Sequence, residues 1–470
     1  MIVKDQIFIN GKWVPSSGAD VIPVISAISE EAIATIPAGT AADVDLAARA
    51  ATDAFPAWSA TSLDERADML HKIARAMEAR VDEIADTVVS ELGYPIEYAR
   101  AAHARAAIKD LTIAADSLRD IAWEEQVGST TVRRAAAGVV GAITPWNGPM
   151  RMVTLKAGAA LAAGCTVVLK GTELAPLSSF LFAEIAEEAG LPAGVFNLVS
   201  GTGPVVGEAL VTHPLVDMVS LTGSVRAGRR VMELASQSVK KVCLELGGKS
   251  ANIILEDADL EAAVTGGITD AFRNTGQACG ALTRMLVPRS RLAEAEQLAI
   301  RTAESFVLGD PYDAETTLGP VANAAQRQRI RDYIQLGIDE GARLLTGGPD
   351  APEGIDKGFF VRPTVFTGDN SLRIAREEIF GPVITIIPFD SENEAFEIAN
   401  DSQYGLAGAI WAGDADRAKS LSSKLRAGRI RINGSPVNLQ APHGGFRLSG
   451  IGRESGRFGV EEYLEYKAIG

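Results

Sequence analysis

Three short segments carry residue types that together could do chemistry on a carbonyl carbon. Cys279 lies in NTGQACG at 274–280, where small residues flank the sulfur and leave space around the thiol. Glu245 lies in LELGGKS at 244–250, and Asn147 ends TPWN at 144–147. A thiol nucleophile, a carboxylate base and an amide donor are the groups that acyl transfer requires.

Several motifs, in order and at matching spacing, resemble those of the aldehyde dehydrogenase superfamily. They begin with FINGKW at 8–13 and end with SGIGRE at 449–454, so the resemblance covers nearly the whole chain. It implies oxidation of an aldehyde to its carboxylic acid by a hydrolytic, NAD(P)-dependent enzyme.

The resemblance also implies a role for each of the three chemical residues. Cys279, as thiolate, would attack the aldehyde carbon and form a thiohemiacetal. The Asn147 amide and the backbone N–H of Cys279 would donate to the oxyanion. After hydride leaves to nicotinamide, Glu245 would activate the water that hydrolyses the thioester.

A second group of residues matches the family's cofactor contacts. Ser224 is a natural N-cap of a helix that follows a strand, and such a helix start binds pyrophosphate through backbone N–H groups. Glu173 would accept hydrogen bonds from ribose hydroxyls and repel a 2'-phosphate, so we expect NAD, with NADP as the alternative. The expected set is Ile143, Thr144, Pro145, Trp146, Lys170, Glu173, Gly203, Gly207, Gly223, Ser224, Gly228, Leu246, Glu378 and Phe380.

The expected substrate channel departs from the family pattern. Gly148 stands where Phe or Tyr is common, and His443 where Phe is frequent. The loss of aromatic rings at these positions would widen the channel, which predicts a bulky aromatic, terpenoid or longer aliphatic aldehyde as substrate. In the alternative, Arg151 pairs with the carboxylate of a semialdehyde. The expected channel residues are Gly148, Arg151, Met152, Leu155, Ala278, Gly280 and His443.

Two other functions compete with this interpretation. A relative that acylates coenzyme A would not need Glu245 to activate water. A catalytically silent structural or binding relative would not need the intact set of Cys279, Asn147 and Glu245.

Composition excludes several classes of partner. The net charge of -15 disfavours nucleic acid and anionic membranes. Three cysteines without short spacing and four scattered histidines predict neither a disulfide framework nor a metal site, and Cys165 and Cys243 are expected to be buried core thiols. The N-terminus lacks the apolar core of a signal peptide, so we expect a cytoplasmic protein. The family resemblance implies a small-molecule aldehyde as its substrate.

Local patterns predict an α/β fold. Thr40 and Ser62 can cap helices, Gly93 can end one, and strands are expected at 166–169, 195–199, 218–221, 251–255, 281–287 and 383–389. A helix is expected at 178–189 and a hairpin at 124–134 with its turn at Gly128-Ser129. The resemblance implies a Rossmann-like NAD-binding domain at 1–115 and 137–247, and an α/β catalytic domain at 248–445. A small β oligomerisation element at 116–136 and 446–470 would build a homodimer or homotetramer.

Overall fold

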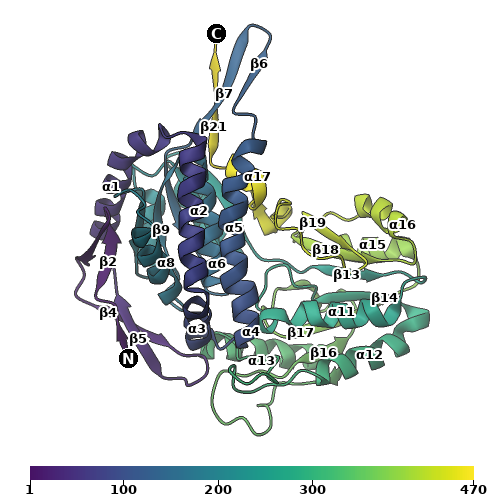
Figure 1. The fold of residues 1–470 in the computed structure, drawn as a ribbon. Helices are drawn as coiled ribbons and strands as arrows, with labels where there is room; N and C mark the ends of the chain where they lie inside the picture. Colours follow the sequence, from purple (N-terminus) through teal and green to yellow (C-terminus); the bar gives the residue numbers. More distant parts are fainter.

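Apolar strands that alternate with helices form two mostly parallel sheets, as expected for an α/β protein. The computed structural model describes all of residues 1–470. Figure 1 shows two α/β units side by side. From the first unit, β6 (Glu124–Val127) and β7 (Thr130–Ala136) project together with the C-terminal strand β21 (Leu464–Ile469).

The first sheet has eight strands in the order β20-β12-β11-β8-β9-β10-β2-β3. The chain runs from β8 outward to β10, then returns to the other side of β8 for β11 and β12. Such a reversal of strand order is where open α/β sheets bind ligands, at the carboxyl ends of the strands. The strands are β2 (Gln6–Ile9), β3 (Lys12–Pro15), β8 (Val139–Ile143), β9 (Thr166–Lys170), β10 (Phe196–Val199), β11 (Met218–Thr222), β12 (Lys241–Glu245) and β20 (Gly450–Ile451).

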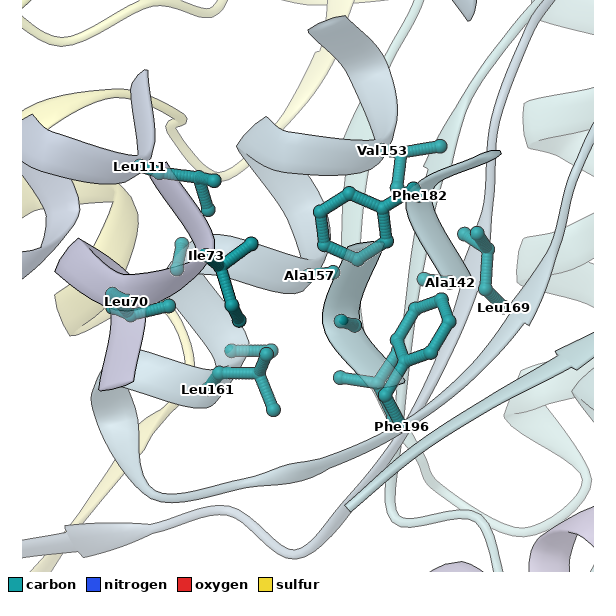
Figure 2. Close-up of a cluster of buried hydrophobic side chains, with 14 of the residues drawn as sticks. Leu70, Ile73, Leu111, Ala142, Val153, Ala157, Leu161, Leu169, Phe182 and Phe196 are labelled. Atoms are coloured by element: carbon teal, nitrogen blue, oxygen red, sulfur yellow. The ribbon is translucent and has the colours of Figure 1, made fainter. Parts of the chain in front are cut away.

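Both faces of this sheet are buried, because alternate residues of each central strand join different hydrophobic clusters. Val140 and Val167 belong to the larger cluster, whereas their neighbours Val139 and Val168 belong to the opposite one. Figure 2 shows part of the larger cluster, where Leu70 and Ile73 lie on the helical side and Phe196 lies on the sheet side. The helices of this unit are α1 (Ala41–Ser59), α2 (Leu63–Ala79), α3 (Val81–Leu92), α4 (Ile96–Tyr98), α5 (Ala106–Asp116), α6 (Pro149–Val153), α7 (Ala159–Ala163), α8 (Leu177–Glu188), α9 (Glu208–Thr212), α10 (Val225–Ser236) and α17 (Gly456–Glu461).

The predicted helix ends are confirmed at three positions. Thr40 and Ser62 each form a capping box. The Thr40 side chain accepts from the Ala42 N–H and the Ser62 side chain from the Glu65 N–H. In return, the carboxylates of Asp43 and Glu65 accept from the backbone N–H groups of Thr40 and Ser62. Gly93 ends α3 with φ 70°, a left-handed conformation that glycine adopts without strain. The predicted helix at 178–189 is α8, shifted by one residue.

The second sheet has seven strands in the order β15-β16-β17-β14-β13-β18-β19. Its predicted strand at 281–287 is wrong at its start, because residues 281–283 form turn hydrogen bonds after Cys279 and β14 begins only at Arg284. The strands are β13 (Ala251–Ile254), β14 (Arg284–Pro288), β15 (Arg343–Thr346), β16 (Thr364–Thr367), β17 (Val383–Phe389), β18 (Ala407–Trp411) and β19 (Arg429–Ile432). The helices are α11 (Leu260–Phe272), α12 (Leu292–Glu304), α13 (Ala324–Asp339), α14 (Arg373–Arg376), α15 (Glu392–Asn400) and α16 (Ala415–Leu421).

Two smaller sheets complete the fold. One joins β1 (Ile2–Val3), β5 (Ala32–Pro37) and β4 (Val21–Ile25), and the other pairs β21 with the confirmed hairpin β6–β7. The strand β20 lies within the range predicted for oligomerisation, yet it pairs with β12 of the first sheet. The division into cofactor, catalytic and oligomerisation domains stays a prediction. None of the helices is both long and apolar enough to cross a membrane.

Candidate active site

The predicted chemical residues collect at the carboxyl edge of the first sheet. Glu245 ends β12, Thr144 follows β8 and Lys170 ends β9, and these strands run parallel across the centre of the sheet. The buried hydroxyls of Thr144 and Thr222 have no hydrogen-bond partner in the protein. Unpaired polar atoms at the carboxyl ends of adjacent strands suit a polar ligand that would complete their hydrogen bonds.

A strained loop presents Cys279. After α11, the 3-10 turn η5 (Arg273–Gly276) places Asn274, Thr275 and Gly276 at φ values of 56°, 56° and 70°. Left-handed conformations are costly for Asn and Thr and persist only where surrounding contacts fix them. Gly276 admits no side chain, since a Cβ there would lie 2.1 Å from the Gly381 carbonyl.

A buried polar network fixes this loop. The Asn274 amide donates to the backbone oxygens of Asn147 and Gln277 at 2.8 and 3.0 Å and to the Tyr94 hydroxyl at 3.1 Å. The Asn274 Oδ1 lies 3.0 Å from His103 Nε2. Burial lowers the pKa of His103 to about 4, so the ring is neutral and Nε2 donates. Neither His103 nor Tyr94 was among the sequence-predicted site residues, because both come from a helical region remote from the motifs.

Asn147 lies beside the Cys279 loop. Its side-chain amide donates to the Gln277 carbonyl at 2.9 Å, two residues before the cysteine. The backbone N–H of Cys279 donates to no protein acceptor. The Asn147 amide is therefore held against the loop that carries Cys279, while the Cys279 N–H is free of protein acceptors.

Cys279 is half-buried, unlike the other two cysteines. Burial raises its pKa to about 11, the Glu245 charge adds to this, and the charges of Arg273 and Arg429 oppose it. The thiol therefore holds its proton at neutral pH and needs a base to become nucleophilic. Cys165 and Cys243 are fully buried, as predicted for core thiols.

Glu245 is a buried carboxylate without a protein partner for either oxygen. Burial, followed by the charge of Glu454, raises its pKa well above the ordinary value, while Lys156 and Arg453 act in the opposite direction. A carboxylate with a raised pKa is a stronger base than an exposed one. The connection from Glu245 to the second sheet passes close to the nucleophile, since a Cβ on Gly248 would lie 2.6 Å from the Cys279 carbonyl oxygen.

A buried ion pair between Lys156 and Glu454 affects the pKa of Glu245, and no motif in the sequence predicted this pair. The Lys156 ammonium donates to Glu454 Oε1 at 2.7 Å and to Ser220 Oγ at 3.1 Å. The Tyr463 hydroxyl lies 3.0 Å from the same Ser220 oxygen. Since both charged side chains are nearly fully buried, this network joins the C-terminal segment to the centre of the first sheet.

The structure brings predicted cofactor residues from separate segments into contact. The Trp146 and Phe380 rings meet edge-to-face with centroids 5.4 Å apart, and Phe380 has a left-handed φ of 64°. Lys170 Nζ donates to Glu173 Oε2 at 2.6 Å. Through this edge-to-face pair, the turn after β8 packs against the segment that follows α14.

The remaining cofactor candidates surround the same edge. Ser224 caps α10 by accepting from the Ala227 N–H, as predicted. Gly228 and Gly207 pack beside Leu246 and Ile143, respectively, while Gly203 faces open space. Glu378 accepts from the Gly248 N–H at 3.0 Å, and burial raises its pKa to about 7. Pro145 lies in the turn after β8, and Gly223 lies between β11 and the Ser224 cap.

The predicted channel residues divide into two groups. Gly148 precedes α6, where a Cβ would meet only the Met152 side chain, at 3.6 Å. Arg151 is not freely solvated, because its Nε donates to the buried carboxylate of Asp110 at 2.9 Å. Leu155 is buried in the π-helical turn after α6. In the second group, Ala278 and Gly280 flank Cys279 in the sequence, and His443 Nε2 lies 3.7 Å from Glu245 Oε2.

Comparison with known proteins identifies the family. The model described as "Aldehyde dehydrogenase family" matches residues 13–469. A 3-succinoylsemialdehyde-pyridine dehydrogenase from a Pseudomonas species is 48% identical over 466 residues, 99% of this chain and 98% of the relative. The chain therefore belongs to the aldehyde dehydrogenase family.

Solved structures agree in fold. A variant of aldehyde dehydrogenase C from Pseudomonas syringae, in complex with NAD+ and octanal, has a TM-score of 0.98 and 48% identity, covering 99% of this chain and 96% of that chain. The aldehyde dehydrogenase of Mycobacterium tuberculosis, in complex with NAD+, has a TM-score of 0.97 and 40% identity, covering 100% and 98%. The predicted fold class is confirmed.

Proposed function

We propose that this protein oxidises an aldehyde to its carboxylic acid through a covalent thioester on Cys279, with NAD as the cofactor. The observation that carries the mechanism is the position of Glu245. It is a buried carboxylate with two unpaired oxygens, the Gly248 segment that follows it approaches the Cys279 carbonyl, and its charge raises the pKa of the Cys279 thiol. A base near a cysteine thiol is the arrangement that nucleophilic catalysis requires.

Each step can be assigned to residues of this chain. The Cys279 thiol gives its proton to Glu245, and the sulfur adds to the aldehyde carbon. The Cys279 N–H and the Asn147 amide, once it leaves the Gln277 carbonyl, donate to the oxyanion. The thiohemiacetal carbon would lose its hydride to become the thioester, and NAD, when bound, would supply the hydride acceptor. Glu245 releases the thiol proton to solvent and is then free to take a proton from water, the hydroxide adds to the thioester, and the C–S bond breaks to return the Cys279 thiolate.

Hydrolysis and transfer to coenzyme A differ in what they require of Glu245. We expect NADH formation to proceed without coenzyme A and to yield the free acid. Replacement of the nucleophile, Cys279→Ala, is expected to abolish NADH formation while cofactor binding, measured by titration, persists. Turnover of the variant at a rate comparable to the parent, or a strict requirement for coenzyme A, would contradict the mechanism.

We propose that the substrate has a bulky or long body. A Cβ at Gly148 would meet only a flexible methionine side chain, so the missing aromatic ring leaves adaptable space. The Pseudomonas relatives are described with octanal and with a pyridine-bearing semialdehyde, which agrees with such space. Each methylene that acetaldehyde leaves unfilled forfeits about 0.8 kcal/mol. Catalytic efficiencies with benzaldehyde, octanal, succinate semialdehyde and acetaldehyde test this, and a preference for acetaldehyde would overturn it.

We further propose that the hairpin β6–β7 and β21 mediate assembly into a homodimer or homotetramer. Every residue of β6 is exposed, and β21 is exposed beyond Leu464, which leaves their polar backbone edges available for pairing. Light scattering of the full chain, compared with a variant in which Pro replaces Val127, tests the assignment. A monomeric parent protein would contradict it.

A further inference from the structure

The guanidinium groups of Arg429 and Arg273 lie close to Gly280, the residue that follows the nucleophile. A Cβ placed on Gly280 would lie 3.3 Å from Arg429 Nη2 and 3.8 Å from Arg273 Nη2. Arg273 begins η5, immediately before the strained loop, whereas Arg429 begins β19. The space beside Gly280, expected from the sequence to widen the channel, is therefore bounded by positive charge.

These arginines belong to a cluster with too few acceptors. Arg273 Nε donates to Asp270 Oδ1 at 3.1 Å, and Arg431 Nη2 lies 2.8 Å from the same oxygen. The other Asp270 oxygen accepts from the Leu282 N–H at 3.1 Å. One carboxylate thus serves two arginines and a backbone donor, and Arg429 adds a third positive charge.

Arg429 is the member without a partner. Its guanidinium makes no hydrogen bond and no ion pair within the protein, although the side chain is half-buried. Burial, followed by the charge of Arg273, lowers its pKa from the usual value. Since a guanidinium remains charged under ordinary conditions, this arrangement costs free energy that an incoming anion would recover. Ile430 and Ile432 point to the opposite side of β19 and pack in the core, which fixes Arg429 and Arg431 on the face towards α11.

The cluster lies near the nucleophile, because Arg429 and Arg273 both approach Gly280, the residue directly after Cys279. The charges of Arg429 and Arg273 act on Cys279, and those of Arg429, Arg151 and Arg273 act on His443. Arg151 differs from the others because the buried Asp110 carboxylate already neutralises it. A substrate anion near Cys279 would therefore find its unpaired cation at Arg429 and not at Arg151.

We propose that Arg429, with Arg273, forms a carboxylate-binding subsite, so that the preferred substrate carries an aldehyde at one end and a carboxylate at the other. This inference rests on the proposed function, because it places the aldehyde carbon at Cys279. The planar guanidinium matches a carboxylate and can donate to it in bidentate geometry. Asp270 holds Arg273 in place and also pairs with Arg431.

In an alternative role, Arg429 and Arg273 would act only on the ionisation of the Cys279 thiol and would not bind the substrate. Both arginines favour the thiolate of Cys279 by their charge, and that effect would act equally on every substrate. The discriminating quantity is consequently the ratio of catalytic efficiencies for an acid and its neutral ester, in which any effect on the thiol cancels.

The first experiment uses the unaltered enzyme with NAD. Omega-oxo carboxylates of about four, six and eight carbons are compared with their methyl esters, which have the same reacting group. We expect at least one acid to exceed its ester by about tenfold in kcat/KM, mainly through KM, and the advantage to shrink at high salt. Equal or better use of the ester at every length would overturn the subsite. Absence of turnover with any aldehyde would instead contradict the proposed function.

The second experiment tests the residue. Arg429→Met is expected to reduce the acid-to-ester ratio by about tenfold, and Arg429→Lys to restore part of it. Arg289→Met, which removes an exposed arginine paired with Asp390, is the matched control and should leave the ratio unchanged. If Arg429→Met retains the parent ratio, or if Arg289→Met lowers it equally, the assignment to Arg429 is wrong.

Discussion

His443 Nε2 lies 3.7 Å from Glu245 Oε2, which places a predicted channel residue against the predicted base. Burial and surrounding arginines lower the pKa of His443 to about 3, so the ring is neutral and the contact is not an ion pair. The distance exceeds that of a hydrogen bond, which leaves Glu245 free to turn towards Cys279 or water. His443 therefore borders the base without neutralising it.

The raised pKa of Cys279 predicts how its alkylation depends on pH. With a pKa of about 11, the reactive thiolate is scarce at neutral pH and its population rises as pH rises. We expect iodoacetamide to inactivate the enzyme about tenfold faster for each pH unit between about pH 7 and 9. Mass spectrometry should locate the label on Cys279 and not on buried Cys165 or Cys243. A rate independent of pH would show that the thiol is already ionised.

Glu245→Gln should separate the two halves of the reaction. The amide cannot take a proton from water, so a thioester is expected to accumulate after one burst of NADH, provided that the thiol proton can leave to solvent. Stopped-flow absorbance and intact mass would detect the burst and the acyl adduct. The experiment is done at raised pH, where more Cys279 thiolate forms without the help of Glu245 and the attack on the aldehyde can proceed. An unchanged steady rate would remove Glu245 from the hydrolytic step.

Glu173 is predicted to set the cofactor preference. Its carboxylate already accepts from Lys170 and would repel a 2'-phosphate, so the parent enzyme should prefer NAD over NADP by at least about tenfold, or ~1.4 kcal/mol. Glu173→Gln should narrow that ratio, whereas Glu261→Gln, on the exposed surface of α11, should not. Equal efficiencies of the parent with both cofactors would contradict the role.

The strained loop predicts an unusual sensitivity at Gly276. Gly276→Ala would combine a left-handed φ with a clash against the Gly381 carbonyl, so we expect loss of activity and destabilisation of about 1–3 kcal/mol or more. Gly190→Ala is the matched control, since Gly190 has φ 80° but open space around it. Denaturant unfolding and activity are compared. Similar small effects of both changes would mean that the loop can shift without consequence.

The buried ion pair predicts a large stability effect. Lys156→Met leaves Glu454 without its cation and should lower the free energy of unfolding by about 3–5 kcal/mol. Adding Glu454→Leu removes the unpaired charge and is expected to recover part of the loss. A double variant no more stable than Lys156→Met alone would argue against this account.

Local signals in the sequence were sufficient for much of the fold. The capping boxes at Thr40 and Ser62 and the hairpin turn at Gly128 involve residues within a few positions of each other, so the pattern specifies the geometry. The error at 281–287 has the opposite origin. Apolar residues after Cys279 resemble a strand, but the turn that exposes the thiol delays β14 to Arg284.

For the site, motifs located the chemical groups but not their surroundings. Cys279, Glu245 and Asn147 could be named because each lies in a recognisable segment. Arg429 could not, because its importance depends on its closeness to Gly280, which is nearly 150 positions away in the turn after Cys279. The same holds for His103, whose partner Asn274 is 171 residues distant.

The C-terminal segment has a consequence for synthesis of the chain. Val460, Tyr463 and Leu464 belong to the same hydrophobic cluster as Trp58 and Leu70, and Glu454 supplies the counter-charge of Lys156. A ribosome releases the first unit's helices and strands hundreds of residues before these closing groups emerge. The nascent first unit therefore lacks part of its core and the counter-charge of Lys156 until the segment around Glu454 to Leu464 has been synthesised.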